Sequence, residues 1–412
     1  MRQKMKFGGG IFPPPQGLVT NYPGENQFGM GPPQGLMAPS LWLPFSDSGS
    51  GIADTTEVIT RATPTFARAT TAWTRLSSLL WTEVASGSAR SYYTSGGMYA
   101  GWLQEGATTN RCLHSRDLTN VVWVAVTVTA AKNQVGIDGV ANSCSLLTAD
   151  ANGGTLLQTV VSGSAARTFS CFMKRSVGTG AVSLTLDGGV SSTDISGQLN
   201  SSTFTLVQIQ QTVTNPVMGF IFATSGDAVI IDMCQEETFG KATTPYPAGA
   251  SAATRNRDTL TYPLTGIINN SEGVFSVEMT PHIAALSFAR IILIADDGTT
   301  AERNQLGLQA SLLVGQYFVN DGNVTQVTMS TANSISGVDG LGKLAIGYKA
   351  NNFAVVLNGS AVVTDVAGSL PTTTTLRVGG LSAATTDAYG AIRNLRYFNR
   401  RLSNSQVQAL TA

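Results

Sequence analysis

The stretch FTLVQIQQTV, from Phe204 to Val213, places apolar side chains at alternate positions over much of its length. This period of two is typical of a β-strand with one buried face. Similar runs, separated by Gly, Asn and Asp, recur between residues 113 and 250: VWVAVTVT (Val122–Thr129), RTFSCFMK (Arg167–Lys174), AVSLTLDGG (Ala181–Gly189) and DAVIIDMCQ (Asp227–Gln235). Many short strands with turn signals between them predict an all-β chain with a jelly-roll sandwich over residues 113–257.

A second set of strand-like runs follows the short polar segment TRNRD (Thr254–Asp258) and predicts a second β-sandwich over residues 258–412. Asn358-Gly359 lies between two apolar runs, which is a strong signal for a two-residue hairpin turn. At the C-terminus the period changes. Ser403 and Gln406 have the spacing of a capping box, so we expect a short closing helix there.

Residues 1–55 are rich in Pro, Gly, Asn and Gln, and the motif PPQGL occurs in them twice. Pro removes backbone donors and Gly adds conformational entropy, so neither helix nor sheet is expected. Large apolar residues nevertheless recur at intervals, as in an arm that docks along another protein; the candidate docking residues are Phe12, Tyr22, Phe28, Trp42 and Phe45. Residues 56–112, rich in Thr, Ser and Ala, are expected to form a β connecting module.

The composition argues against several classes of partner. Charged residues make up 12% of the 412 residues and the net charge is zero, whereas soluble proteins average about 25% charged residues. Nucleic-acid binding requires a basic footprint, and an electrostatic membrane anchor requires a basic cluster. Because the charge is low and balanced, we expect no nucleic-acid partner. No apolar run approaches the ~20 residues of a membrane helix, so we expect no membrane insertion. No signal peptide is visible, so we expect the chain to fold in the cytoplasm.

Few residues suggest metal or cofactor chemistry. The four cysteines form no CxxC pair, so we expect buried free thiols, no metal site and no cofactor. His114 and His282 lie beside polar turn residues, no Gly-x-Ser-x-Gly motif accompanies them, and we expect them at the surface or at caps. The Asp-rich segments Asp296–Glu302 and Val338–Gly340 favour turns, with calcium ligands as the alternative.

Glu105 lies in GWLQEGATTNRCLHS (Gly101–Ser115), either as a catalytic carboxylate or as part of a joint between two pieces of chain. Glycoside hydrolysis requires two carboxylates about 5–10 Å apart. The sequence pairs Glu105 with no second acid, because the nearby Asp117 lies in a turn-like stretch. We therefore favour the joint, assign no catalytic residue and expect no enzymatic activity.

The same stretch resembles a segment found in many tailed-bacteriophage structural proteins. The resemblance rests on Gly101, Leu103, Glu105, Ala107, Thr109, Asn110, Ser115 and Trp123, and on the upstream segment RATPTFARATTAW (Arg61–Trp73). Residues 113–257 resemble the carbohydrate-binding-type jelly roll that follows in such proteins. GAIRNLRYFNRRLSNSQVQALTA (Gly390–Ala412) is similar to the last strand and helix of concanavalin-like (laminin G-like) domains of phage fibres and spikes.

The resemblance implies a virion structural protein, a head or tail fibre exposed on the assembled particle. Residues 1–50 would contact other virion proteins, and the chain would form a homo-oligomer, with a trimer as the first expectation. The sandwiches would contact the host surface or its glycans; the candidate glycan-binding residues are Tyr317, Tyr348 and Tyr389, of which Tyr389 is expected to be the most exposed and Tyr348 to be core. The alternatives are a capsid or tail decoration protein without a ligand and, less favoured, a polysaccharide depolymerase.

Overall fold

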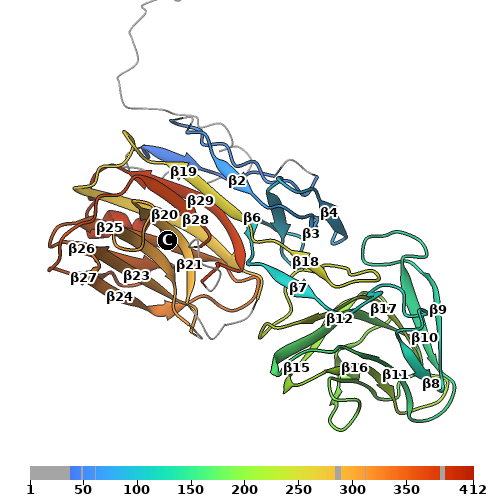
Figure 1. Ribbon diagram of the computed structural model, residues 1–412. Coiled ribbons are helices and arrows are strands. Elements are labelled where there is room, and N and C mark those ends of the chain that lie inside the picture. Colours follow the sequence, from blue (N-terminus) through green and yellow to red (C-terminus); the bar gives the residue numbers. More distant parts are fainter. Residues whose placement is uncertain (1–37, 48–49, 61, 284–288, 311, 381–385) are drawn as a thin grey trace, which may run out of the picture.

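The computed structural model describes residues 38–412 except 48–49, 61, 284–288, 311 and 381–385. Within these ranges the chain is built almost wholly from antiparallel strands, with a 3₁₀ turn at Ser196–Gln198 and the α-helix α1 (Asn404–Ala409). The strands form two β-sandwiches, which lie at opposite ends of the molecule in Figure 1. The predicted all-β class with two tandem sandwiches is therefore confirmed.

The first sandwich consists of two five-stranded sheets. The first sheet has the order β15-β12-β17-β10-β9, and its strands are β9 (Val128–Gln134), β10 (Cys144–Ala149), β12 (Ala165–Val177), β15 (Thr205–Val213) and β17 (Ala228–Glu237). The second has the order β14-β13-β16-β11-β8, and its strands are β8 (Val124–Val126), β11 (Gly154–Thr159), β13 (Val182–Thr185), β14 (Thr193–Asp194) and β16 (Val217–Phe222).

Alternation along β15 and β12 builds the core of this sandwich. Val207 and Ile209 pair with Cys171 and Phe169, and all four side chains pack in one apolar cluster, which also contains Phe220 of the facing sheet. The intervening residues face the other way, as the period of two requires.

The second sandwich packs an eight-stranded sheet against a seven-stranded one. The eight-stranded sheet contains β1 (Leu41–Leu43), β5 (Arg90–Tyr93), β6 (Tyr99–Gln104), β20 (Glu272–Pro281), β25 (Gly342–Lys349), β26 (Phe353–Leu357), β27 (Val363–Asp365) and β29 (Gly390–Phe398). The seven-stranded sheet has the order β2-β19-β28-β21-β22-β23-β24 and contains β2 (Thr65–Ala67), β19 (Thr259–Pro263), β21 (Arg290–Asp296), β22 (Arg303–Leu308), β23 (Val314–Asp321), β24 (Val324–Ser334) and β28 (Thr375–Val378).

The end of the predicted arm belongs to this second sandwich. Strand β1 pairs with β29, and Trp42 and Phe45 are buried, with the Phe45 ring 5.9 Å from that of Trp102. The predicted arm boundary at residue 55 is therefore wrong. Trp42 and Phe45 are not free to dock elsewhere, because the apolar segment Leu41–Leu43 pairs with β29 as a strand of the second sandwich. The other candidate docking residues, Phe12, Tyr22 and Phe28, lie outside the described residues.

Residues 56–112 do not form a separate module. Strands β2, β5 and β6 extend the sheets of the second sandwich, whereas β3 (Ala72–Arg75) and β4 (Trp81–Val84) pair only with each other. Strand β7 (Thr108–Asn110) pairs with β18 (Ala253–Arg255) next to the first sandwich. The second sandwich is thus assembled from segments that are distant in sequence, whereas the first is built from the continuous stretch 124–237. The chain between the two sandwiches crosses the same region twice, at β7 and at β18.

Two local predictions are confirmed in detail. Asn358 and Gly359 have φ values of 48° and 65°, and the Ser360 N–H donates to the Leu357 carbonyl, which closes the turn between β26 and β27. Ser403 caps α1 in a complete capping box with Gln406. The four cysteines are buried and free, as predicted.

Candidate functional site

Glu105 follows β6 and is fully buried where the two sandwiches meet. Its Oε2 accepts a hydrogen bond from Arg90 Nη1 at 3.0 Å and contacts Arg255 Nη1. Its Oε1 accepts from the Thr244 N–H at 2.9 Å and lies 2.7 Å from His282 Nε2. These partners come from β5, from the segment that leaves the first sandwich, and from the residue after β20. Glu105 is thus the point at which three parts of the chain are joined.

A second buried carboxylate, Asp258, completes this joint. Arg90 Nη2 donates to Asp258 at 2.5 Å, Arg68 Nη1 donates at 2.7 Å, and the Glu105 N–H donates at 3.2 Å. Arg90 therefore bridges both carboxylates, and its Nη1 also donates to the Trp73 carbonyl at 2.8 Å. We call the set of Arg68, Arg90, Glu105, Arg255 and Asp258, together with His282, the joint.

The electrostatics of the joint keep Glu105 ionised. Burial alone would raise the pKa of its carboxyl, but Arg255, His282 and Arg90 outweigh burial and hold the pKa well below its ordinary value. Both oxygens are occupied by donors and the side chain has no contact with solvent. Glu105 therefore has neither a proton to give nor a substrate to reach, as the sequence-based interpretation as a joint requires.

An apolar seam surrounds the charged groups. Trp81 of β4 meets Phe172 of β12 edge to face, with ring centroids 5.6 Å apart. Trp73, Tyr92 and Leu103 pack in the same cluster, together with Ile137 and Met233 of the first sandwich. The seam excludes water from the ion pairs, which strengthens the attraction between their charges.

A third acid, Asp387, lies beside the joint. Its Oδ1 accepts from Gln104 Nε2 at 2.9 Å and from Arg257 Nε at 2.5 Å, whereas its buried Oδ2 has no hydrogen-bond partner among the described residues. Burial outweighs the attraction to Arg257 and raises the pKa of Asp387 to about 6. The charge of this carboxyl therefore changes in a mildly acidic range.

The structure places the three candidate tyrosines inside the molecule. Tyr317 and Tyr348 are fully buried, and Tyr389 is 3% exposed. The core position of Tyr348 is as expected, but the predicted exposure of Tyr389 is wrong, because its ring stacks on Phe239 at 4.8 Å. None of the three presents a free ring face on which a sugar could stack.

The other candidate residues divide into confirmed and corrected predictions. His282 is buried against Glu105, so its predicted surface position is wrong. Asp297 caps a turn by accepting from the Thr299 N–H, and the Gly340 N–H donates to the Gly337 carbonyl, so both segments form the expected turns. No cluster of His, Cys, Asp or Glu in the described part of the chain could hold a metal ion.

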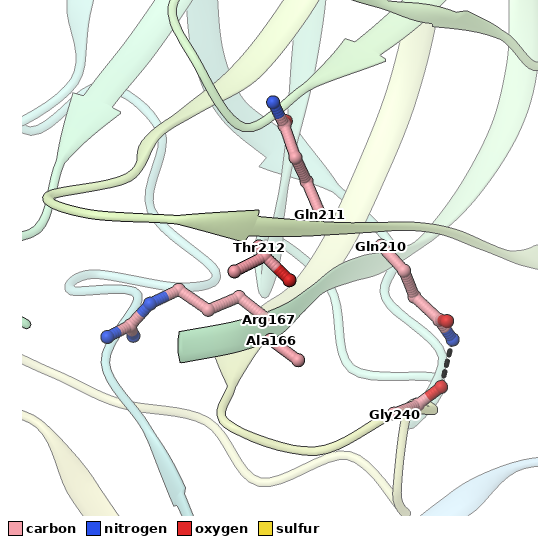
Figure 2. A pocket seen from close by; sticks show the side chains of 6 residues that line it. All are labelled: Ala166, Arg167, Gln210, Gln211, Thr212 and Gly240. Carbon is pink, nitrogen blue, oxygen red and sulfur yellow. Dashed lines mark hydrogen bonds between the residues drawn. The ribbon is translucent and has the colours of Figure 1, made fainter. Parts of the chain in front are cut away.

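One open hollow of about 240 Å³ lies at the end of the β12–β15 pair (Figure 2). Three of its polar side chains are already engaged. Arg167 donates to Glu236 at 2.7 Å, Gln211 donates to Asp187 at 2.8 Å, and Gln210 donates to the Gly240 carbonyl. The hollow therefore offers a ligand few free groups.

Part of the joint has a signal in the sequence, although the polarity of TRNRD predicts a linker. TRNRD supplies Arg255 and Asp258, and in a chain with so few charged residues such a dense group is unusual. Charged residues that are rare and clustered between two apolar segments could have indicated a buried network. Arg68 and Arg90, in contrast, lie among Thr, Ser and Ala with no local sign that they are buried.

Among the described residues, no helix is long and apolar enough to cross a bilayer. No protein-family model matches the sequence, and no curated protein matches it.

The fold is similar to that of several solved β-sandwich domains. The CBM40 of the Ruminococcus gnavus IT-sialidase is 16% identical over 36% of this chain and 86% of that chain, with a TM-score of 0.30. A SAP-like pentraxin from Limulus polyphemus is 13% identical over 34% and 70%, with a TM-score of 0.29, and the botulinum neurotoxin serotype D binding domain is 13% identical over 37% and 40%, with a TM-score of 0.30. At these levels the likeness concerns the β-sandwich fold alone.

Proposed function

We propose that this chain is a structural protein of a tailed-phage virion, a head or tail fibre that docks through its N-terminal segment and presents its sandwiches to the host surface. The observation that supports this role is the joint. The two segments whose sequences resemble phage structural proteins, Arg61–Trp73 and Gly101–Ser115, supply Arg68 and Glu105 to one buried ion network. A buried network closed by an apolar seam resists bending between the sandwiches, which suits a projecting fibre.

The same geometry supports binding without turnover. Glu105, the residue with the strongest claim to catalysis in the sequence, is buried, ionised and saturated with donors. A retaining or inverting glycosidase needs an exposed pair of acids on either side of the scissile bond. We therefore propose attachment to a host glycan rather than its cleavage. Release of reducing sugar from host polysaccharide by the purified chain would contradict this.

Docking to the particle is tested by a truncation that respects the fold. Removing residues 1–37 leaves β1 in its place against β29, whereas a longer deletion would remove Trp42 and Phe45 from the core. We expect the truncated chain to fold and to be absent from purified particles. Normal incorporation of the truncated chain would overturn docking through this segment. A decoration role would be favoured by a different result: the intact chain is incorporated, but particles that lack it adsorb to the host equally well.

Oligomerisation belongs to the same proposal. Strand β8 lies at the edge of its sheet, and Val124 and Val126 on it are exposed, as is Val121 before it. Exposed apolar edges are typical surfaces for association between copies. We propose a homo-oligomer, with a trimer as the first expectation. A monomeric mass by light scattering at micromolar concentration would contradict it.

A further inference from the structure

The outer face of the seven-stranded sheet carries a row of polar side chains around one aromatic ring. Burial alternates along β22 and β23, with Leu306, Tyr317 and Val319 in the core and Arg303, Gln305 and Phe318 on the other face. Gln305 and Phe318 are directly opposite each other, and Thr328 of β24 follows in the same row. We call Arg303, Gln305, Gln316, Phe318 and Thr328 the polar face.

Arg303 is the unusual member of the polar face. Its guanidinium lies 4.7 Å from the centre of the Phe318 ring, and its Nε is buried without a hydrogen-bond partner among the described residues. No described carboxylate forms an ion pair with it. Most other arginines in the described part of the chain have one within 4.0 Å: Arg68, Arg75, Arg90, Arg111, Arg116, Arg167, Arg175, Arg255, Arg257, Arg377 and Arg393.

The nearest acids are already occupied. Asp296 is opposite Arg303 in the register, but its Oδ2 accepts from Arg377 Nε at 2.6 Å and its Oδ1 accepts from the Gly298 N–H at 2.9 Å. Glu302 accepts from the Gly322 N–H at 2.6 Å. Asp296 therefore attracts Arg303 without forming an ion pair with it, and the N–H groups of Arg303 have no carboxylate partner among the described residues.

The neighbouring amides point to a ligand with hydroxyl groups. The Oε1 of Gln305 is buried without a hydrogen-bond partner among the described residues, and Gln316 and Thr328 offer further donors and acceptors on the same face. A guanidinium held flat on a ring keeps its N–H edges free, and those edges match a carboxylate in two parallel hydrogen bonds. Burial lowers the pKa of Arg303, which means that the charged guanidinium is partly desolvated in the folded chain. A bound anion would offset this desolvation cost.

We propose that the polar face binds a carboxylate-bearing sugar of an acidic host glycan, with Arg303 on the carboxylate and Gln305 and Gln316 on hydroxyl groups. This inference rests on the proposed role in glycan attachment and adds the class of glycan. The tyrosines expected for sugar stacking are buried, so on this face the charge, rather than an aromatic platform, provides the recognition.

The experiment compares full-length wild-type protein with two variants in affinity electrophoresis. The probes are polygalacturonate, hyaluronan and polysialic acid, each paired with the same polymer after reduction of its carboxyl groups to alcohols. We expect retardation by at least one acidic polymer and none by its reduced form. Arg303→Gln should weaken the interaction about tenfold, since one charge-assisted bidentate contact is lost.

Arg400→Gln is the matched control, because it removes the same charge from an exposed position of the same sandwich. It should leave retardation unchanged. Equal retardation of wild type and Arg303→Gln, equal retardation by acidic and reduced polymers, or no retardation by any acidic polymer would each overturn the inference. The proposed virion role is judged separately, by the incorporation of chains lacking residues 1–37. Thermal unfolding of both variants verifies that they are folded.

Discussion

The joint and the polar face use the same kinds of side chain in opposite ways. At the joint, Arg90 donates to Glu105 and to Asp258, and no charge is left exposed. At the polar face, Arg303 has a ring beneath it and forms no ion pair with any carboxylate of the described residues. The first arrangement satisfies its charges within the chain. The second leaves one half-buried charge for something outside the chain.

The difference shows how a charge-poor protein can separate architecture from recognition. Taking charges out of water is costly, and a buried network is retained only if each group finds its partners. Removing one partner at the joint should therefore destabilise the fold. Removing the unpaired group at the polar face should leave the fold intact and affect only binding.

The largest effect is expected for Glu105→Ala. The substitution leaves Arg90, Arg255 and His282 around an empty, buried position, and breaking a buried ion network typically costs about 3–5 kcal/mol. Urea unfolding at pH 7 measures the loss. Because the pKa of Glu105 is held low, its contribution is present at neutral pH and is lost as the pH falls below the ordinary range of a glutamate.

The control for this prediction is Glu83→Gln, on the exposed side of β4 in the same region. A surface substitution of this kind should change stability by less than about 0.5 kcal/mol. If Glu105→Ala and Glu83→Gln had similar unfolding free energies, the joint would not be the element that holds the sandwiches together. Should the alanine variant fail to fold, Glu105→Gln keeps the shape and removes only the charge.

A somewhat smaller effect is expected for Phe172→Ala, which opens the apolar seam but leaves the ion pairs in place. Phe172 packs against Trp81 across the two halves of the molecule, and loss of a buried aromatic ring costs about 3 kcal/mol. Small-angle X-ray scattering should also show a larger radius of gyration, because the sandwiches can move apart. Val161→Ala, at a position 88% exposed, should change neither quantity.

Much of the fold could be predicted from local patterns. Alternation in FTLVQIQQTV predicts a strand with one buried face, and Asn358-Gly359 and Ser403–Gln406 predict a turn and a cap. The structure confirms all three, because each depends on neighbouring residues only. The predicted boundary of the arm is wrong because Leu41–Leu43 pairs with β29, which lies more than about 350 positions further along the chain. A local pattern does not show such a distant pairing.

The site was harder to predict because burial of charged groups is decided by tertiary packing. The sequence identified Glu105 as part of a joint, but Arg68 and Arg90 carry no local sign of the carboxylates they meet. Tyr389 lies in a segment that looks like an exposed turn, yet Phe239 from the first sandwich covers it. Such contacts depend on how the two sandwiches meet, which no single-segment pattern encodes.

Asp387 gives the next prediction, of intermediate size. Its pKa is raised to about 6 in the folded chain, above the ordinary value of 3.8, so the folded state binds the proton more tightly than the unfolded state. Stability therefore falls as the pH rises from about 4 to about 6, by an amount on the order of 2 kcal/mol. Asp387→Asn removes this titration, so the wild type should lose stability relative to the variant over that window.

The difference between the two unfolding curves isolates this group from the other acids. Asp297 provides a control of opposite sign, because hydrogen bonds from Thr299 lower the pKa of its carboxyl. The wild type should gain stability relative to Asp297→Asn as the pH rises through the ordinary range of an aspartate. Parallel curves for the wild type and Asp387→Asn between pH 4 and pH 6 would contradict the prediction.

The smallest effect is expected for Arg303→Gln, and it tests the comparison most directly. The variant loses a cation–π contact worth about 0.5–1 kcal/mol, but it also removes a half-buried charge whose Nε has no partner, so the two changes offset each other. The unfolding free energy should therefore stay within about 1 kcal/mol of wild type. Arg90→Gln is the same substitution at the joint. It removes a cationic partner from both Glu105 and Asp258, so the unfolding free energy should fall by about 3 kcal/mol. Urea unfolding of both variants at pH 7 measures the contrast. A loss at Arg303 as large as that at Arg90 would mean that Arg303 is a structural residue, and its charge would then no longer be available for a ligand.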